Sequence, residues 1–161
     1  FNEYHEMKLV IAPHVVSDSH LKEILDKVKR PCIRYTEATE ENVTQADCLI
    51  IDCYGLLSSI YRYGEISYIG GGFGVGIHNV LEAAVYGIPV IFGPNNKKFR
   101  EAQHLLEQKG GFEVTGYDDF KRLMDKFLSD EAYLQQAGKA AGNYVNHNAG
   151  ALEKIMKDIT L

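Results

Sequence analysis

The sequence predicts an α/β fold, a doubly wound parallel sheet of the Rossmann-like kind, and two observations carry that prediction. Apolar runs of strand length alternate with segments of helical period as far as about residue 115. The runs are apolar on both faces, which is typical of parallel strands covered by helices on each side and joined by right-handed crossovers. With 161 residues, the chain has the length of one ordinary domain.

Six strands and the helices between them follow from this pattern. The predicted strands are Leu9–Ala12, Ile33–Tyr35, Leu49–Ile51, Ile66–Ile69, Val90–Phe92 and Phe112–Val114. Apolar residues repeat at helical spacing in Ser19–Lys29 and Phe99–Lys109, which predicts two amphipathic helices. After about residue 117 the pattern is wholly helical, over Asp118–Leu128, Glu131–Asn146 and Ala149–Ile159. We expect these last helices to pack outside the sheet.

The composition narrows the classes of function. Lys and Arg total 17 against 22 Asp and Glu, and the resulting net charge of -5 disfavours a sequence-independent grip on nucleic acid. The longest apolar runs are far shorter than the roughly 20 residues that span a bilayer, so no transmembrane helix is expected. Cys32, Cys48 and Cys53 form no Cys-x-x-Cys motif and are expected to be free thiols of a reducing compartment. The chain opens on Phe1 without a signal peptide, and we expect a piece cut from a longer protein.

The most informative stretch begins where the fourth predicted strand ends. Five glycines occupy the seven positions 70–76, and an apolar helical segment follows from Val80. Glycines permit close approach of the backbone, and the free amides and dipole at a helix start attract an anion such as phosphate. Because ligands of open parallel sheets bind at the carboxyl ends of the strands, this loop is expected to bind a nucleotide.

Two familiar phosphate-binding motifs do not match the stretch. The dinucleotide fingerprint needs a third glycine at a position that Val75 or Ile77 occupies, depending on the starting glycine. A P-loop needs Lys after its last glycine, but Ile77 follows Gly76. The stretch is therefore neither of these two motifs.

Polar side chains follow the glycines on one face of the first helical turn. Asn79 and Glu82 are three residues apart, and His78 lies on nearly the same face. In one interpretation Glu82 accepts hydrogen bonds from ribose hydroxyls while Asn79 and the loop amides hold the phosphate. In the other, Asn79-x-x-Glu82 is a capping box that only satisfies backbone amides. Asp52 is expected to cap the helix that follows it, and no His spacing predicts a metal site.

The residues from Gly70 to Phe99 resemble a known family. Gly-x-His-Asn-x-Leu-Glu-Ala-Ala at 76–84 and Gly-Ile-Pro-Val-x-x-Gly-Pro at 87–94 are similar to the carboxyl-terminal half of the Kdo transferases. These bacterial glycosyltransferases move 3-deoxy-D-manno-oct-2-ulosonic acid (Kdo) from CMP-Kdo to a lipid A precursor in lipopolysaccharide biosynthesis. The likeness extends from about Lys8 to Met156 and is most specific from Asp47 to Gln103.

The resemblance implies the two-domain GT-B fold, with residues 1–161 as the nucleotide-sugar (donor) binding domain and the amino-terminal acceptor domain absent from this chain. It implies a CMP-Kdo-dependent glycosyltransferase that is inverting and metal-independent and has no cofactor, with its general base in the missing domain, so that the fragment alone is inactive. The lipid A precursor would bind through that domain. The nucleotide-sugar-binding residues that it implies are Pro13, His14, Gly70, Gly71, Gly72, Gly76, His78, Asn79 and Glu82.

The resemblance also implies a location and a set of partners. The fragment would be cytoplasmic, would bind no nucleic acid and would not insert into a membrane. The parent enzyme would lie at the cytoplasmic face of the inner membrane.

The sequence departs from the family pattern at several positions. Family members commonly carry Pro-Arg-His in the first loop, whereas Pro13-His14 lacks the arginine, and Leu56 stands where glutamate is usual. A basic cluster at 97–100 would restore charge near the donor, or it is a solvated helix start. Two alternatives therefore stay open. One is a UDP-sugar-binding domain of another GT-B transferase or epimerase, and the other is a non-catalytic domain that kept the fold and lost the site.

Overall fold

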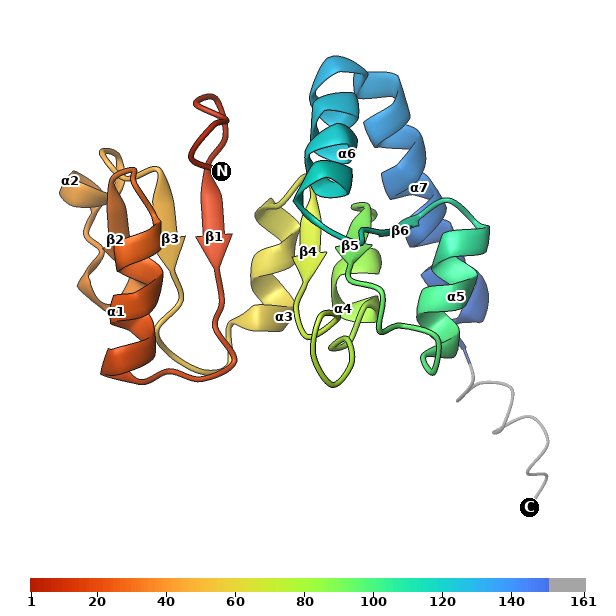
Figure 1. Ribbon diagram of the computed structural model, residues 1–161, viewed down its shortest axis with the longest axis horizontal. Helices are drawn as coiled ribbons and strands as arrows, with labels where there is room; N and C mark the ends of the chain where they lie inside the picture. Colours follow the sequence, from red (N-terminus) through yellow and green to blue (C-terminus); the bar gives the residue numbers. More distant parts are fainter. Residues whose placement is uncertain (151–161) are drawn as a thin grey trace. The chain divides into compact units, whose positions relative to one another are not determined.

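The computed structural model describes residues 1–150, and the chain divides into two compact units, Phe1–Ser59 and Ile60–Leu161 (Figure 1). Each unit contains its own three-stranded parallel sheet with helices packed beside it. The strand–helix alternation of the Rossmann-like α/β fold is therefore present in both units, and each is described by itself.

The first unit is built on the sheet β1-β3-β2. Its strands are short, and the central one places Cys48 opposite both Leu9 and Cys32. The buried core of this unit is formed by Leu21 of the helix that follows β1 and by Cys48 and Ile50 of the central strand. The elements are β1 (Leu9–Ile11), α1 (Asp18–Lys27), β2 (Cys32–Arg34), the 3-10 turn η1 (Tyr35–Glu37), α2 (Glu40–Val43) and β3 (Cys48–Ile50).

The second unit is built on the sheet β4-β5-β6, whose middle strand is wholly buried. The chain enters it through α3 (Leu57–Ile60) and the 3-10 turn η2 (Tyr61–Tyr63). The strands are β4 (Ser67–Ile69), β5 (Val90–Phe92) and β6 (Gly111–Glu113), and the helices are α4 (Leu81–Ala84), α5 (Arg100–Glu107), α6 (Tyr117–Ser129) and α7 (Glu131–Asn148). Because all three strands are parallel, the loops that follow them meet at one edge of the sheet.

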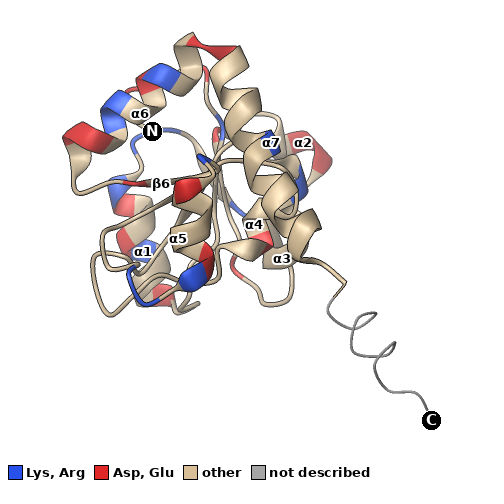
Figure 2. Cartoon of the chain, turned by 90° about the vertical axis from the view of Figure 1, so that its right-hand side faces the viewer, with Lys and Arg blue, Asp and Glu red and all other residues tan. Residues whose placement is uncertain are grey.

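The two long helices that end the described chain, α6 and α7, have different packing partners. On α6, Phe127 packs edge-on against Phe112 of β6, with ring centroids 5.1 Å apart. The other face of α6 carries interleaved acidic and basic residues (Figure 2), among them the Lys121–Asp125 pair at 3.6 Å. In contrast, α7 packs on α4, α5 and α6, and its Tyr144 hydroxyl lies 3.1 Å from Nδ1 of His104 on α5.

The strand predictions are confirmed, each within one residue of the observed position. The helix expected behind the glycines is much shorter than its apolar pattern indicated, because the chain turns after α4 and Gly87 takes a left-handed conformation with φ of +69°. The predicted helix over Ala149–Ile159 lies outside the described residues, except for Ala149 and Gly150. Within residues 1–150, no helix is long and apolar enough to cross a membrane.

The helix α7 packs closely against the turn after α4 because Gly138, at the contact, has no side chain. A Cβ on Gly138 would lie 2.3 Å from the carbonyl oxygen of Gly87, a distance that real Cβ atoms do not reach. Alanine at an ordinary helix position is more stable than glycine by about 1 kcal/mol. At Gly138 this gain is opposed by overpacking, which costs about 1–3 kcal/mol and separates α7 from the turn.

We predict that Gly138→Ala lowers the free energy of unfolding by about 1–2 kcal/mol, because the steric cost exceeds the gain in helix propensity. Urea unfolding followed by circular dichroism measures this change. Gln136→Ala, at an exposed position of the same helix, is the control and is expected to change stability by less than about 0.5 kcal/mol. A Gly138→Ala variant more stable than the parent would contradict the close contact.

Candidate functional site

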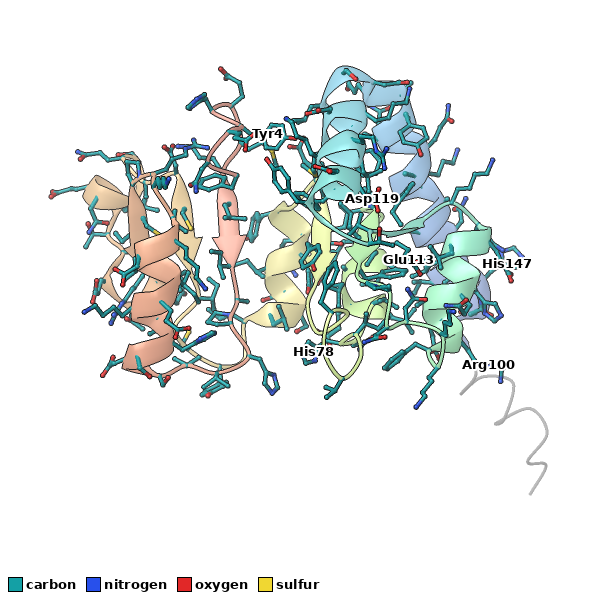
Figure 3. All side chains as sticks on the ribbon, viewed as in Figure 1. Tyr4, His78, Arg100, Glu113, Asp119 and His147 are labelled. Atoms are coloured by element: carbon teal, nitrogen blue, oxygen red, sulfur yellow. The ribbon has the colours of Figure 1, made fainter. Side chains whose placement is uncertain are left out.

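The candidate site lies at the carboxyl edge of the second sheet and is built on the segment that follows β4. Residues 70–78, the glycine loop, fold back on themselves through three backbone hydrogen bonds. The amides of Gly74 and Gly76 donate to the carbonyl oxygen of Gly71 at 2.9 and 3.2 Å, and the amide of His78 donates to that of Gly70 at 3.1 Å. The loop is therefore a closed turn, and Figure 3 shows His78 beside it.

Three of the five glycines are required by the packing of the protein itself. Gly71 has φ of +88°, and a Cβ there would lie 2.2 Å from the carbonyl oxygen of Gly76. A Cβ on Gly72 would lie 2.6 Å from the backbone of Gly93, in the loop after β5. Gly76 has φ of +146° and lies under the ring of Phe99. These glycines need no ligand to explain them.

Gly70 and Gly74 are different. A Cβ on Gly70 would meet nothing closer than Cδ2 of His78 at 3.9 Å, and one on Gly74 would meet nothing closer than the carbonyl oxygen of Gly71 at 3.6 Å. Both are ordinary van der Waals distances, and neither glycine has a positive φ. Side chains would therefore fit these two positions, and their absence leaves room for a ligand to approach the backbone.

Asn79 and Glu82 are joined to each other directly. The side-chain amide of Asn79 donates to Oε1 of Glu82 at 3.0 Å, and its Oδ1 accepts from the amide of Leu81 at 3.0 Å. A capping box would instead need the Glu82 carboxylate to accept from the main-chain amide of Asn79. Among residues 1–150, no protein donor is found for Oε2 of the half-buried Glu82. The capping-box interpretation is therefore wrong, and one carboxylate oxygen remains available.

The helix behind the glycine loop is too short to supply much of the dipole expected at a helix start. α4 has only four residues, and its N-cap, Val80, makes no side-chain capping bond. Four residues align too few peptide dipoles to give the field of a full helix end. If an anion binds here, the amides of the glycine loop have to hold it.

Tyr61 lies near the carboxylate of Glu82. Burial raises the pKa of the Tyr61 phenol, and the negative charge of Glu82 raises it further. Because this folded-state pKa is above the ordinary value of about 10, the neutral phenol contributes stability that is complete below pH of about 10. That contribution is lost as the pH rises through the folded-state pKa.

The segment after β5 supports the glycine loop through Asn95 and Asn96, two residues to which the sequence analysis gave no role. In residues 93–99, the β5–α5 loop, the amide of Asn95 donates to the carbonyl oxygen of Gly72 at 2.9 Å and its side chain donates to that of Gly74 at 2.5 Å. Asn96 is 1% exposed and donates to Oε2 of Glu113 at 2.6 Å. Two adjacent asparagines directly after a buried strand were the available signal for this role.

The loop after β1 lies in the first unit and is described there alone. Pro13 is half-buried and His14 is exposed, just beyond the end of β1, as the sequence indicated. Asp52, after β3, does not cap the following helix: its carboxylate accepts from the amide and the hydroxyl of Thr36, at 3.0 and 2.6 Å. Partial burial opposes ionisation of Asp52, but the Thr36 hydrogen bonds outweigh it and hold the pKa below its ordinary value.

The structure thus brings most of the predicted site residues into one segment of the second unit. Those residues are Gly70, Gly71, Gly72, Gly76, His78, Asn79 and Glu82. The basic cluster of Lys97, Lys98 and Arg100 is exposed at the start of α5, where Figure 3 labels Arg100. An apolar cavity of about 420 Å³ lies beside Phe73 of the glycine loop and is lined also by Tyr68, Val114, Gly116, Tyr117 and Phe120.

Comparison with known proteins agrees with the sequence motifs. The chain is 32% identical over 128 residues to the 3-deoxy-D-manno-octulosonic acid transferase of Aquifex aeolicus (strain VF5), covering 78% of this chain and 35% of the relative. The chain is a relative of the Kdo transferases. It is also 28% identical over 149 residues to the Kdo transferase of Rickettsia felis, covering 87% of the chain and 31% of that enzyme. No protein-family model matches the chain.

A solved structure shares the fold. The crystal structure of the C-terminal CMP-Kdo binding domain of WaaA from Acinetobacter baumannii superposes with a TM-score of 0.72 at 17% identity, covering 89% of this chain and 76% of that one. The Rossmann-like α/β fold is therefore confirmed. The chain spans about a third of the length of the Kdo transferases that it matches.

We predict that Glu82→Gln lowers the pKa of Tyr61, because it removes the nearby negative charge, and leaves that pKa above about 10, because burial remains. NMR titration of protein labelled with ¹³Cζ-tyrosine measures it, with Tyr61→Phe to assign the resonance. An unchanged Tyr61 pKa in Glu82→Gln would contradict the electrostatic contact between the two side chains.

Proposed function

We propose that the chain is the donor-binding domain of a glycosyltransferase that moves Kdo from CMP-Kdo to a lipid A precursor. The relationship to the Kdo transferases carries this proposal. A match that covers 78% of the chain includes its middle wherever the match begins, and so includes the glycine loop and Glu82. The available carboxylate oxygen of Glu82 and the two unconstrained glycines support a nucleotide at the same edge of the sheet.

In the proposed complex each group has a separate task. Oε2 of Glu82 accepts from a ribose hydroxyl, while Asn79 holds the other carboxylate oxygen and so fixes the orientation of the group. The backbone approaches the CMP phosphate at Gly70 and Gly74, where no side chain intervenes, and loop amides donate to it. For Pro13 and His14, in the first unit, contact with the nucleotide sugar stays a prediction from the family resemblance. Gly71, Gly72, Gly76 and His78 shape the loop.

The proposed chemistry is an inverting displacement. An acceptor hydroxyl attacks the anomeric carbon of Kdo, the bond from that carbon to the phosphate oxygen breaks, and CMP leaves with the bonding electrons. Donors that face the phosphate stabilise the charge that grows on it as the bond breaks. The general base that takes the hydroxyl proton belongs, in this proposal, to a part of the longer protein outside this chain. The chain alone would bind donor and transfer nothing.

The proposal extends to location and to metal. The acceptor is a membrane lipid precursor, so we place the parent enzyme in the cytoplasm at the inner face of the inner membrane. The donor domain holds CMP-Kdo with backbone amides and Glu82 and uses no resident metal or cofactor. It contacts neither nucleic acid nor the interior of the bilayer.

We predict that Glu82→Ala weakens CMP binding by roughly ten- to a hundredfold, the effect of losing about 1.5–3 kcal/mol of hydrogen bonding to a charged group. Isothermal titration calorimetry measures the affinity, and thermal unfolding of the same variant measures stability. Glu82→Gln separates loss of charge from loss of length. Glu107→Ala, at an exposed position at the end of α5, is the matched control and should bind CMP as the parent does.

Three outcomes would count against parts of this proposal. Unchanged CMP affinity in a destabilised Glu82→Ala variant would make Glu82 purely structural. Preference for UMP over CMP would favour a UDP-sugar domain. Failure to bind any nucleotide at millimolar concentration would favour a domain that has lost its site, in line with the missing first-loop arginine and with Leu56.

We predict that CMP affinity changes by less than about twofold when EDTA replaces magnesium in the buffer, because the proposed phosphate donors are backbone amides. The same calorimetric titration in the two buffers measures this. A large loss of affinity in EDTA would show that a divalent cation bridges the phosphate, and would overturn the metal-independent part of the proposal.

A further inference from the structure

The glycine loop is held in place by the β5–α5 loop at three points, and only one of them is made by a side chain that a substitution can remove cleanly. The backbone of Gly72 rests on Gly93, and the ring of Phe99 lies against Gly76. The third point is Asn95, whose main-chain amide and side-chain amide donate to the carbonyl oxygens of Gly72 and Gly74. The Asn95 side chain therefore acts on one peptide unit, the one between Gly74 and Val75.

The amides of Gly74 and Gly76 both donate to the carbonyl oxygen of Gly71, and the peptide between Gly74 and Val75 has its own hydrogen bond from Asn95. The Val75 side chain is fully exposed, at 108%, and so gains no packing from the protein. Gly74 has no side chain, and a Cβ on it would lie no closer than 3.6 Å to any atom beyond the two adjacent residues. The orientation of the Gly74–Val75 peptide therefore depends on the hydrogen bond from Asn95, which is 21 residues away in the sequence.

That hydrogen bond determines where an amide points. The peptide is planar and trans, so its carbonyl and its N–H point in opposite directions. With the Gly74 carbonyl turned toward Asn95, the N–H of Val75 is turned away from the β5–α5 loop. By the same geometry, the bond from the Asn95 amide to the Gly72 carbonyl turns the N–H of Phe73 away from that loop. Two amides of the loop tip, those of Phe73 and Val75, thus face away from the β5–α5 loop, where they can donate to an anion.

Asn95 is itself held by its neighbours. The next residue, Asn96, is buried and bonds to three parts of the second unit. Its side-chain amide donates to the carbonyl oxygen of Gly93 at 2.9 Å and to Oε2 of Glu113 at 2.6 Å, and its Oδ1 accepts from Gln103 at 2.6 Å. The β5–α5 loop is therefore anchored to β6 and α5, and it provides a rigid support from which Asn95 reaches the glycine loop.

We propose that Asn95 is a positioning residue for the donor phosphate: by holding the Gly74 carbonyl, it turns the Val75 amide toward the place where the phosphate of the nucleotide binds. The inference rests on the proposed function, and it adds to it a residue in a different loop that acts through the backbone. It assigns Asn95 to the phosphate and not to the base or the ribose. Its removal should therefore affect ligands that carry a phosphate and spare those that do not.

The test compares CMP with cytidine on the same proteins. For Asn95→Ala we expect CMP affinity to fall by about fivefold or more, and cytidine affinity to change by less than about twofold, in titrations followed by ¹⁵N–¹H NMR. In the ligand-free protein the Val75 amide resonance should shift, while the melting temperature stays within a few degrees of the parent. Asn143→Ala, at an exposed position of α7, is the asparagine control and should alter neither affinity.

The outcomes separate this inference from the function on which it rests. Equal losses for CMP and cytidine, or unchanged CMP affinity in Asn95→Ala, would overturn the positioning role while leaving CMP binding by the parent intact. If the parent bound neither ligand, the proposed function would fail. The Val75 resonance would then report on Asn95 alone, and an unshifted Val75 amide in Asn95→Ala would overturn its hold on the loop.

Discussion

The backbone contact between the two loops of the site, Gly72 against Gly93, is the constraint on which the rest of the site depends. A side chain at either position would come within 3 Å of the backbone of the other. Because neither has one, the glycine loop lies directly on the loop after β5. This contact brings the Asn95 amides within reach of two glycine-loop carbonyls and places the Phe99 ring against Gly76. The site is therefore a pair of stacked loops, and not a single phosphate-binding turn.

Contacts within the protein explain most of the glycines in this loop without a ligand. Five glycines in seven positions indicated a ligand, but Gly71, Gly72 and Gly76 are explained by contacts within the protein. The support for a ligand rests on fewer residues: the unconstrained Gly70 and Gly74, the exposed amides at the loop tip, and Glu82. A carboxylate with one oxygen bound to Asn79 and the other without a donor among residues 1–150 is oriented before any ligand arrives, which lowers the entropic cost of binding.

The supports of the site are as informative as the site itself. Asn96 is a buried polar residue whose side-chain nitrogen and oxygen are both hydrogen-bonded, which is the condition under which a buried amide is tolerated. Those bonds tie the loop after β5 to β6 and to α5. Burial and the charge of Glu82 together raise the pKa of the Tyr61 phenol above its ordinary value. The polar groups at this edge of the sheet are therefore held by their neighbours in the second unit.

The sequence by itself determined the six strands and the long helices α1, α5, α6 and α7. The strand Val90–Phe92 is apolar throughout because it is buried throughout, and the other five strands were visible as short, mostly apolar runs. The loops after these strands were the places to search for a site. The sequence pattern did not predict the short length of α4, the hydrogen bonding of Asp52 to Thr36, or the direct Asn79–Glu82 bond. It also did not predict the roles of Asn95 and Asn96. Most of these depend on groups that are distant in the chain: Thr36 is 16 residues from Asp52, and Gly74 is 21 from Asn95. Which of these hydrogen bonds form depends on how the loops pack against one another at the edge of the sheet. Side-chain spacing along one helical turn cannot distinguish a capping box from a side-chain pair, because both place the same two residues on the same face.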